Sequence, residues 1–357
     1  MPERLFYQAE KLRSLNRYDP ALRYYKKALK KYRDSGNQEG ALYCLIAMAD
    51  VLRMLGRYRD SLKCYEEAFQ LTKVLRKPSL RADAETGMGL CLRGMGQWKE
   101  ALKHFRRAKN YYRKAEDIEG LAFILWAEAG AYRYGGEPLK AIELLKEALE
   151  INEELNDLES TGYCLNALGG ASRVAGLYKD SLRYYRKANQ LFETTGDRFG
   201  RAYSYCGIGN AFRMYGKYDE AMDNFRKALR IYKQIGDIVS SAYTLWSIGQ
   251  TYTMLARPKM AERYYKSAYE RFKKTGDHRG RVYYLLGIAQ CYIQHNETNK
   301  ARRFLKKAEE ISTAYGFKLE HCHCVTIAGL LENQKTDCYS RLGIKFKVSG
   351  SLPLNIP

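Results

Sequence analysis

Arginine recurs at intervals of forty residues along much of this sequence. The series has six consecutive members: Arg13, Arg53, Arg93, Arg133, Arg173 and Arg213. A guanidinium group presents a planar fork of N–H donors that can bind a carboxylate through two parallel hydrogen bonds. Six such groups in register predict a strip that holds an acidic partner. Each exposed pair contributes only about 0.2–1 kcal/mol, so binding would depend on several pairs together.

Aromatic and amide side chains accompany the arginines at fixed offsets. Tyr203, Cys206, Asn210 and Arg213 are spaced three, four and three residues apart, which places them on one side of a helix. The same columns supply the other candidate groove residues: Tyr163, Tyr243, Trp126, Trp246 and Asn166. The rings offer flat contact area, and the amides offer hydrogen bonds to a peptide backbone.

A structural role for the arginines is the alternative. Each guanidinium would then pair with an acidic neighbour in the next repeat and hold the stack together. The series ends at Arg213, and Thr253 and Ile293 occupy the next two positions, whereas the small residues that serve packing continue to the end of the array. This difference favours a binding role.

The forty-residue period extends to small residues. Alanine occupies every position of one column: 28, 68, 108, 148, 188, 228, 268 and 308. Within one period, a glycine such as Gly216 separates two apolar stripes of helical spacing, and a Gly-Asp pair such as Gly236-Asp237 ends the second stripe. Neither helix can bury its apolar face alone, so the pairs must stack. The pattern predicts an all-α, right-handed superhelical solenoid of eight antiparallel helix pairs with a C-terminal capping helix.

The period also predicts the boundaries. The eight repeats are expected at 1–36, 37–76, 77–116, 117–156, 157–196, 197–236, 237–276 and 277–316. Residues 317–334 should form the capping helix. Residues 335–357 are predicted to be an extended or disordered tail, because Ile344, Phe346 and Val348 alternate with polar residues. Three arrangements are open: a frayed terminus, a segment folded back on the last repeats, or one that reaches a neighbouring copy.

One period resembles the tetratricopeptide repeat (TPR). The pattern is Gly209-x-x-Phe212-x-x-x-Gly216-x-Tyr218-x-x-Ala221-x-x-x-Phe225-x-x-Ala228. The unit is about six residues longer than the usual TPR of about 34. The longer unit is similar to the repeats of the Pins/LGN group of cell-polarity adaptors, and to repeat domains of some bacterial transcription regulators. The resemblance covers residues 2–316 and implies a solenoid whose concave face binds protein segments. The Pins/LGN group has G-protein-binding motifs beyond its repeats, and residues 335–357 contain no candidate for them.

The net charge of the chain suggests a second class of function. The 357 residues carry a formal net charge of +21. Basic charge interleaved with aromatics is also the footprint of single-stranded nucleic-acid recognition, so RNA or single-stranded DNA binding is the alternative. No RNA-recognition motif accompanies the charge, and repeat packing explains most of the aromatics. Residues 121–160 depart from the basic balance with nine acidic and three basic side chains, which leaves self-association open.

Cysteine usage and hydropathy indicate a cytoplasmic protein. No apolar run is long enough for a membrane span, and the first residues lack the apolar core of a signal peptide. The nine cysteines are odd in number, and Cys44, Cys164 and Cys206 fall within predicted helices. A disulfide framework is therefore not expected.

Motifs for catalysis are absent from the sequence, which has no nucleotide-binding loop, Gly-x-Ser-x-Gly or His-Glu-x-x-His. One run, His321-Cys322-His323-Cys324, could supply metal ligands together with Cys291 or Cys338, but the paired spacings of zinc sites are missing. We therefore expect no catalytic residue, cofactor or metal.

These patterns together predict a non-catalytic protein–protein interaction scaffold. It would capture an extended, acidic peptide segment in its concave groove. Besides nucleic-acid binding, a regulatory or sensor module of a larger signalling or transcription complex is an alternative.

Overall fold

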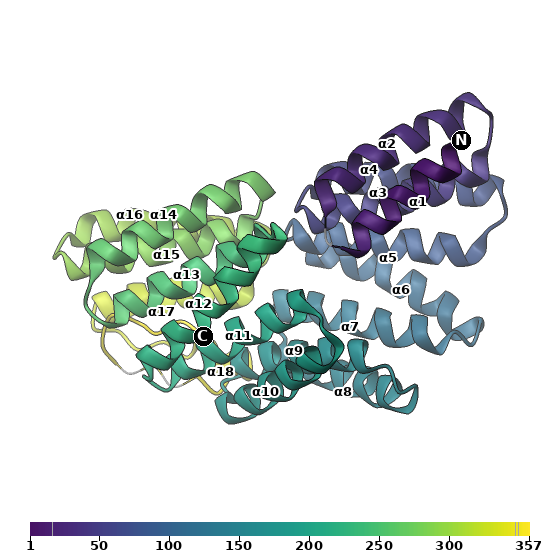
Figure 1. The fold of residues 1–357 in the computed structure, drawn as a ribbon. Coiled ribbons are helices and arrows are strands. Elements are labelled where there is room, and N and C mark those ends of the chain that lie inside the picture. The colour runs from purple at the N-terminus through teal and green to yellow at the C-terminus, as the bar shows by residue number, and fades with distance from the viewer. Residues whose placement is uncertain (16, 347, 349) are drawn as a thin grey trace. The chain divides into compact units, whose positions relative to one another are not determined.

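The computed structural model describes residues 1–15, 17–346, 348 and 350–357. Helices are the only regular secondary structure in these ranges (Figure 1). In chain order they are α1 (Pro2–Ser14), α2 (Tyr18–Asp34), α3 (Gln38–Met54), α4 (Tyr58–Val74), α5 (Pro78–Gly94), α6 (Trp98–Lys114), α7 (Ile118–Tyr134), α8 (Pro138–Glu154), α9 (Leu158–Val174), α10 (Tyr178–Thr195), α11 (Arg198–Met214), α12 (Tyr218–Ile235), α13 (Val239–Met254), α14 (Pro258–Thr275), α15 (His278–Gln294), α16 (Thr298–Tyr315), α17 (Lys318–Leu331) and α18 (Cys338–Arg341). Within each unit, successive helices pack as A and B pairs, such as α3 with α4 and α11 with α12, which confirms the predicted all-α stack of helix pairs.

The chain divides into two compact units, Met1–Ala127 and Glu128–Pro357. We call them the N-terminal unit and the C-terminal unit. The boundary falls within α7, the A helix of the fourth predicted repeat.

A residue with positive φ follows each A helix from α3 to α15 and starts the turn to its B helix. At Gly56 and Gly216 φ is 71° and 72°, a left-handed conformation that glycine adopts without steric cost. Ala256 and Asn296 take the same place in the last two pairs, with φ of 53° and 61°. The turn geometry therefore persists where the glycine has been lost.

The aspartate at each Gly-Asp boundary caps the A helix that follows. Asp197 accepts a hydrogen bond from the Gly200 N–H at 3.0 Å, and Asp277 accepts one from the Gly280 N–H at 2.8 Å. Such a cap satisfies one of the unpaired N–H groups at a helix start and contributes about 0.5–2 kcal/mol. This explains why aspartate recurs at the repeat boundary.

Glycines on the A helices lie directly against rings from the B helices. A Cβ added to Gly209 would lie 2.7 Å from the Phe225 ring, and one added to Gly249 would lie 2.7 Å from the Tyr265 ring. Both rings are fully buried. Glycine at these two positions lets the helices approach closely, and Ala49, Ala129 and Ala289 take the same place in other repeats, so the column requires a small residue.

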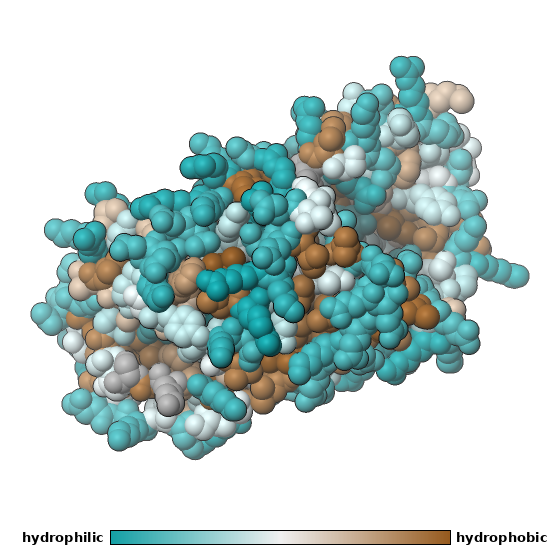
Figure 2. All heavy atoms as spheres, turned by 60° about the horizontal axis from the view of Figure 1, so that its bottom comes forward, coloured by the Kyte–Doolittle hydropathy of each residue, from teal (hydrophilic) through white to brown (hydrophobic). Residues whose placement is uncertain are grey.

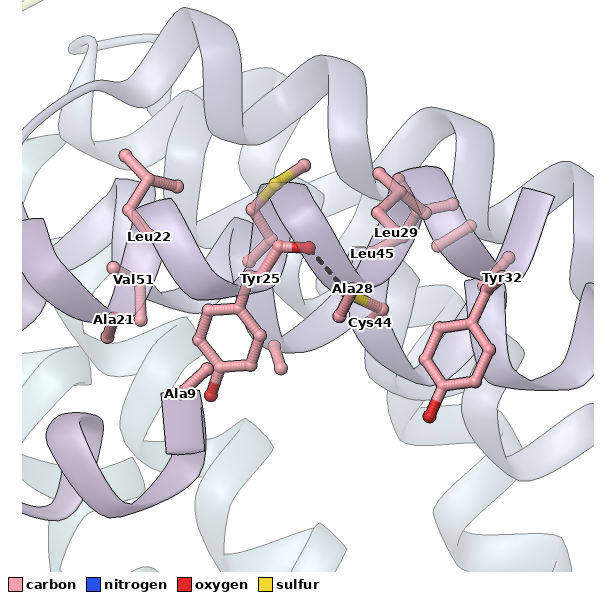
Figure 3. Close-up of a cluster of buried hydrophobic side chains, with 14 of the residues drawn as sticks. Ala9, Ala21, Leu22, Tyr25, Ala28, Leu29, Tyr32, Cys44, Leu45 and Val51 are labelled. Atoms are coloured by element: carbon pink, nitrogen blue, oxygen red, sulfur yellow. Dashed lines mark hydrogen bonds between the residues drawn. The ribbon is translucent and has the colours of Figure 1, made fainter. Parts of the chain in front are cut away.

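The N-terminal unit buries one apolar cluster formed by its first helices. Tyr25 and Ala28 of α2 pack with Cys44 and Leu45 of α3, and the Cys44 thiol donates a hydrogen bond to the Tyr25 carbonyl oxygen at 3.2 Å (Figure 3). Cys44 is thus a packing residue, as its place in a predicted helix indicates.

In the C-terminal unit, the segment that follows α16 returns to the first turns of the same unit. Helix α17 packs on α16 and α15. Its Lys318 Nζ lies 3.1 Å from Glu137 Oε1, and the Lys345 N–H donates to the Ala175 carbonyl oxygen at 3.0 Å. Since Glu137 and Ala175 belong to the turns after α7 and α9, residues 318–346 span the unit from its last repeat to its first turns.

The tail is folded back onto this unit, where it lies against α9 of the fifth repeat as well as against the later repeats. It begins with the short helix α18, which the sequence pattern does not predict, and Tyr339 and Ile344 pack with Val174 and Leu319.

A disulfide, which the cysteine count does not lead one to expect, joins Cys322 of α17 to Cys338 of α18, with Cα atoms 5.4 Å apart. The spacing of the two cysteines does not reveal this pair, because only the fold of the tail brings residue 338 to α17. The other seven cysteines are free.

Charged side chains cover the outer surface, and Figure 2 shows hydrophilic residues over much of one face. Many form pairs within one helix, such as Arg226 with Asp223 at 3.0 Å, whose side chains are 66% and 65% exposed. Pairs this exposed contribute little to stability. In the part of the chain that the structure describes, no helix has the length and apolar character needed to cross a membrane.

Replacing Ala188 with leucine is expected to lower the free energy of unfolding by about 1–3 kcal/mol, because the added atoms enter a filled core. Ala188 is fully buried and packs with Leu165 and Phe192. Urea unfolding followed by circular dichroism measures the change. Lys187→Leu is the matched control, since Lys187 is exposed, and it should change stability by less than about 0.5 kcal/mol. Equal unfolding midpoints for the two variants would contradict the packing assignment.

Candidate functional site

In the N-terminal unit, two arginines of the series pair with carboxylates of their own helix. Arg13 Nη2 lies 2.6 Å from Glu10 Oε2, and Arg53 Nη2 lies 3.2 Å from Asp50 Oδ1. The partner precedes the arginine by three residues, so it does not come from the next repeat, as the structural alternative proposed. One helical turn brings the two side chains together.

Arg93 uses the next repeat in a different way. Its Nη1 donates to the Ala127 carbonyl oxygen at 3.0 Å, and its guanidinium lies 5.2 Å from the centre of the Trp126 ring. Two predicted groove residues, Arg93 and Trp126, therefore contact each other in the N-terminal unit.

The residue three positions before each arginine changes along the chain. This column reads Glu10, Asp50, Leu90, Gly130, Gly170, Asn210, Gln250 and Gln290. Carboxylates occupy it only in the first two repeats. The arginines of the C-terminal unit, Arg133, Arg173 and Arg213, therefore have no acidic partner one turn earlier in their own helix.

Gly170 makes room for one of these arginines. A Cβ added to Gly170 would lie 2.7 Å from Arg133 Nη1 and 3.2 Å from the Tyr185 hydroxyl. The absence of a side chain in α9 thus lets the Arg133 guanidinium reach across from α7.

Arg133 and Arg173 line a cavity of about 180 Å³ within the C-terminal unit, which we call the arginine cavity. Four more of the predicted site residues lie in its wall: Tyr203, Asn210, Tyr243 and Trp246. The structure adds Arg279 and Pro357 to the lining.

Arg279 carries no repeated signal, because the equivalent positions of the other repeats hold no arginine. Its Nε lies 2.6 Å from Glu320 Oε1, and its Nη2 donates to the Tyr283 hydroxyl at 3.0 Å. The Arg279 and Glu320 side chains are only 9% and 0% exposed, so this is a buried ion pair that links α15 to α17.

Arg213 is fully buried beneath the tail. Its Nη2 donates to the Ile356 carbonyl oxygen at 2.8 Å, and its Nη1 donates to Asn355 Oδ1. Asn355 Nδ2 donates in return to the Arg213 carbonyl oxygen at 3.0 Å. The last arginine of the series is thus occupied by a segment of the same chain.

Two glutamines hold the neighbouring residue of the tail. Gln250 Nε2 donates to the Leu354 carbonyl oxygen at 2.7 Å, and the Leu354 N–H donates to Gln290 Oε1 at 2.5 Å. We call Arg213, Gln250 and Gln290 the main-chain site. The sequence analysis did not predict either glutamine as a site residue. Both occupy the position of Asn210 in the next two repeats, and this shared position could have identified them.

Burial shifts the pKa of two basic side chains in the interior of this unit. Burial and, to a smaller extent, the charge of Arg173 together lower the pKa of Arg213 to about 10. Burial also lowers the pKa of His323 to about 3, and the charges of Arg279 and Arg173 act in the same direction.

Tyr163 and Tyr243 connect neighbouring repeats. The Tyr163 hydroxyl donates to Asp197, and the Tyr243 hydroxyl donates to Asp277 at 2.6 Å. Both aspartates are helix caps, so these two predicted groove residues also hold the repeats together.

Two other predicted residues make contacts of the same kind. Asn166 Nδ2 donates to the Gly200 carbonyl oxygen at 3.2 Å, and Trp246 Nε1 donates to the Tyr283 carbonyl oxygen at 2.8 Å. Their donors are used within the solenoid.

The cysteine–histidine run of α17 is divided among separate contacts. Cys322 is bonded to Cys338, and His323 Nδ1 lies 2.6 Å from the Tyr339 hydroxyl. Within residues 1–15, 17–346, 348 and 350–357, no three His, Cys, Asp or Glu side chains are grouped so as to hold a metal ion.

The repeat geometry agrees with a comparison of the sequence with known families. The family model described as tetratricopeptide repeat matches residues 5–73, 80–154, 162–234 and 240–314. The chain belongs to the tetratricopeptide repeat family. No curated protein matches the chain. The finer resemblance to the Pins/LGN group stays a prediction.

Solved structures share the fold at low sequence identity. A Rap protein complexed with competence and sporulation factor has a TM-score of 0.63 and 14% identity, over 96% of this chain and 98% of that one. NprR in complex with its cognate peptide NprX has a TM-score of 0.61 and 18% identity, over 96% and 98%. Aspartyl phosphate phosphatase F from Bacillus subtilis has a TM-score of 0.50 and 15% identity, over 87% and 94%. At these identities the likeness shows the fold alone.

The buried His323 predicts a pH dependence of stability. Between the ordinary histidine pKa of about 6.5 and the folded value of about 3, the unfolded chain binds a proton that the folded chain does not. The free energy of unfolding should therefore fall as the pH decreases through this window, by about 1.4 kcal/mol per pH unit.

Urea unfolding of wild type and His323→Gln at a series of pH values isolates this contribution. The comparison is needed because burial raises the pKa of Asp277, which acts in the opposite direction. The substitution should remove the histidine part of the slope. Parallel pH profiles for the two proteins would show that His323 is not buried in the neutral form.

Proposed function

We propose that this protein is a non-catalytic scaffold that binds an extended peptide segment at the main-chain site of its C-terminal unit. The observation that carries the proposal is the recognition of backbone atoms there. Gln250 and Gln290 bind the C=O and the N–H of one residue, Leu354, much as a neighbouring strand would. Arg213 binds the next carbonyl but one, that of Ile356.

Recognition of this kind does not depend on the identity of the bound residues, so it suits a segment from a partner as well as the chain's own tail. Selectivity would come from the side chains. Leu354 and Ile356 are 1% and 0% exposed, and their alternation places both on the same side of an extended segment. We therefore expect a partner with apolar residues at two alternate positions.

The acidic character of the partner is the finer part of the proposal. It rests on Arg133 and Arg173, which lack acidic neighbours in their helices and line the cavity next to Pro357. The chain also carries a formal net charge of +21, so an acidic partner would be attracted from a distance.

Nucleic-acid binding has less support than peptide binding. Stacking on bases requires exposed rings. Trp246 is only 4% exposed, and the Tyr243 hydroxyl is bonded to Asp277. These two rings of the predicted groove are therefore used within the protein.

Structures of similar fold add support for a peptide ligand. The Rap protein was solved with competence and sporulation factor, and NprR with its cognate peptide NprX. We further propose a cytoplasmic location, since the cysteines within the described repeats are free and the disulfide between Cys322 and Cys338 lies in the segment that follows them.

A synthetic peptide with the sequence of residues 351–357 is expected to bind, with saturation, to a chain that lacks these residues, because the main-chain site is then vacant. Fluorescence anisotropy of the labelled peptide measures the affinity. Gln250→Ala should weaken binding about 5- to 10-fold by removing one hydrogen bond to the backbone.

Two controls accompany this measurement. A peptide in which Leu354 and Ile356 are both replaced by aspartate should not bind, and Gln190→Ala, at an exposed position of α10, should leave the affinity unchanged. Absence of saturable binding by a folded truncated chain would refute the proposal.

A further inference from the structure

The arginine cavity holds more positive than negative charge. Arg133, Arg173 and Arg279 all line it. Glu320 balances Arg279 through the ion pair at 2.6 Å. No ion pair with Arg133 or Arg173 occurs among the described residues that line the cavity, so two guanidinium charges remain uncompensated there.

Asp277, a buried aspartate of the same unit, forms no ion pair with Arg133 or Arg173 among the described residues. Asp277 Oδ2 accepts the Tyr243 hydroxyl at 2.6 Å, and its Oδ1 accepts the Gly280 N–H at 2.8 Å. Both carboxylate oxygens thus have partners that belong to the repeat architecture.

A hydrogen-bond donor in the cavity also lacks an acceptor. Arg173 Nε is buried and has no hydrogen-bond partner. Burying a charged donor without an acceptor is costly, so such a group indicates an acceptor that arrives with a ligand.

Water alone would not compensate the positive charge of the arginine cavity. The volume of about 180 Å³ corresponds to about six water molecules at the density of the liquid. Water can accept the free hydrogen bonds, but it does not neutralise charge. A cavity of this size also has room for one acidic group.

We propose that the arginine cavity binds one oxyanion group, a carboxylate or a phosphoryl group, carried by the segment that occupies the main-chain site. This inference rests on the proposed function and names the chemistry of its ligand. Pro357 lines the cavity, so a segment on the path of Leu354 and Ile356 delivers its following residue there. The Pro357 side chain carries no charge, and no ion pair joins the described residues of the tail to Arg133 or Arg173.

The geometry differs from a strip of independent ion pairs. The predicted ladder would bind one acidic group at each arginine. In the C-terminal unit Arg213 is used for the backbone, whereas Arg133 and Arg173 face a single cavity, joined by Arg279. Guanidinium forks that converge on one cavity suit the two or three oxygens of one oxyanion.

Thermal unfolding of the full chain in millimolar sodium phosphate, compared with sodium chloride at equal ionic strength, tests the cavity. Phosphate is expected to raise the midpoint by about 2–4 °C through binding to the folded state. Phosphate also stabilises proteins by exclusion from their surface, so the shift is compared among variants.

Arg173→Gln and Arg133→Gln should each lose the phosphate-specific shift. Arg226→Gln is the matched control, because Arg226 is 66% exposed and paired with Asp223, and it should keep the shift. Equal phosphate shifts in all four proteins would overturn the proposal.

A second pair of variants does not depend on how well the arginine variants fold. Pro357→Glu places a carboxylate at the cavity wall, and Pro357→Gln is the uncharged match. The glutamate variant should unfold at a midpoint about 2–4 °C above that of the glutamine variant and should no longer respond to phosphate. Equal midpoints for the two variants would overturn delivery of the anion by the bound segment.

These results separate the two proposals. Two results together would overturn the peptide-borne group: a phosphate shift that requires Arg173, and equal midpoints for Pro357→Glu and Pro357→Gln. The cavity would then be assigned to a free small anion. Failure of the 351–357 peptide to bind would overturn the main-chain site. A phosphate shift that Arg173→Gln abolishes would still support anion binding.

Discussion

Close approach of the two helices within each repeat is the constraint on which the rest of the structure depends. Gly209 and Gly249 of the A helices have no side chain where the Phe225 and Tyr265 rings of the B helices are buried. A pair that packs this tightly has little freedom of angle or register, so every repeat presents the same A-helix positions on the same face. The regular columns of the sequence are a consequence of that repetition.

Within this fixed geometry, the residue one turn before each arginine decides what the arginine does. Asp50 neutralises Arg53 in the N-terminal unit. In the C-terminal unit Gly170 leaves space into which the Arg133 guanidinium extends. An identical column of arginines therefore yields neutral pairs in the first two repeats and unpaired charge in the C-terminal unit. The difference between the two units therefore comes from the residue three positions before each arginine, not from the arginine itself.

The segment after the last repeat gives the C-terminal unit its particular chemistry. Glu320 of this segment pairs with Arg279 of α15, the third guanidinium at the cavity. The disulfide between Cys322 and Cys338 fixes the start of the tail on α17. The tail then lies over Arg213. A peptide that binds the main-chain site must displace the tail. Because the tail is part of the same chain, its effective concentration at the site is high, and this lowers the apparent affinity of a partner peptide.

The sequence by itself determined the repeating helix pairs, since the period, the turn glycines and the Gly-Asp caps are local features that each repeat restates. It also predicted that Tyr203, Asn210 and Arg213 share one side of their helix, because helical spacing fixes which residues of one helix lie on the same side. Only the tertiary structure decided how these groups are used. The return of the tail, the contact of residue 338 with α17 and the burial of Arg213 each join positions far apart in the chain, and no periodic pattern encodes such contacts.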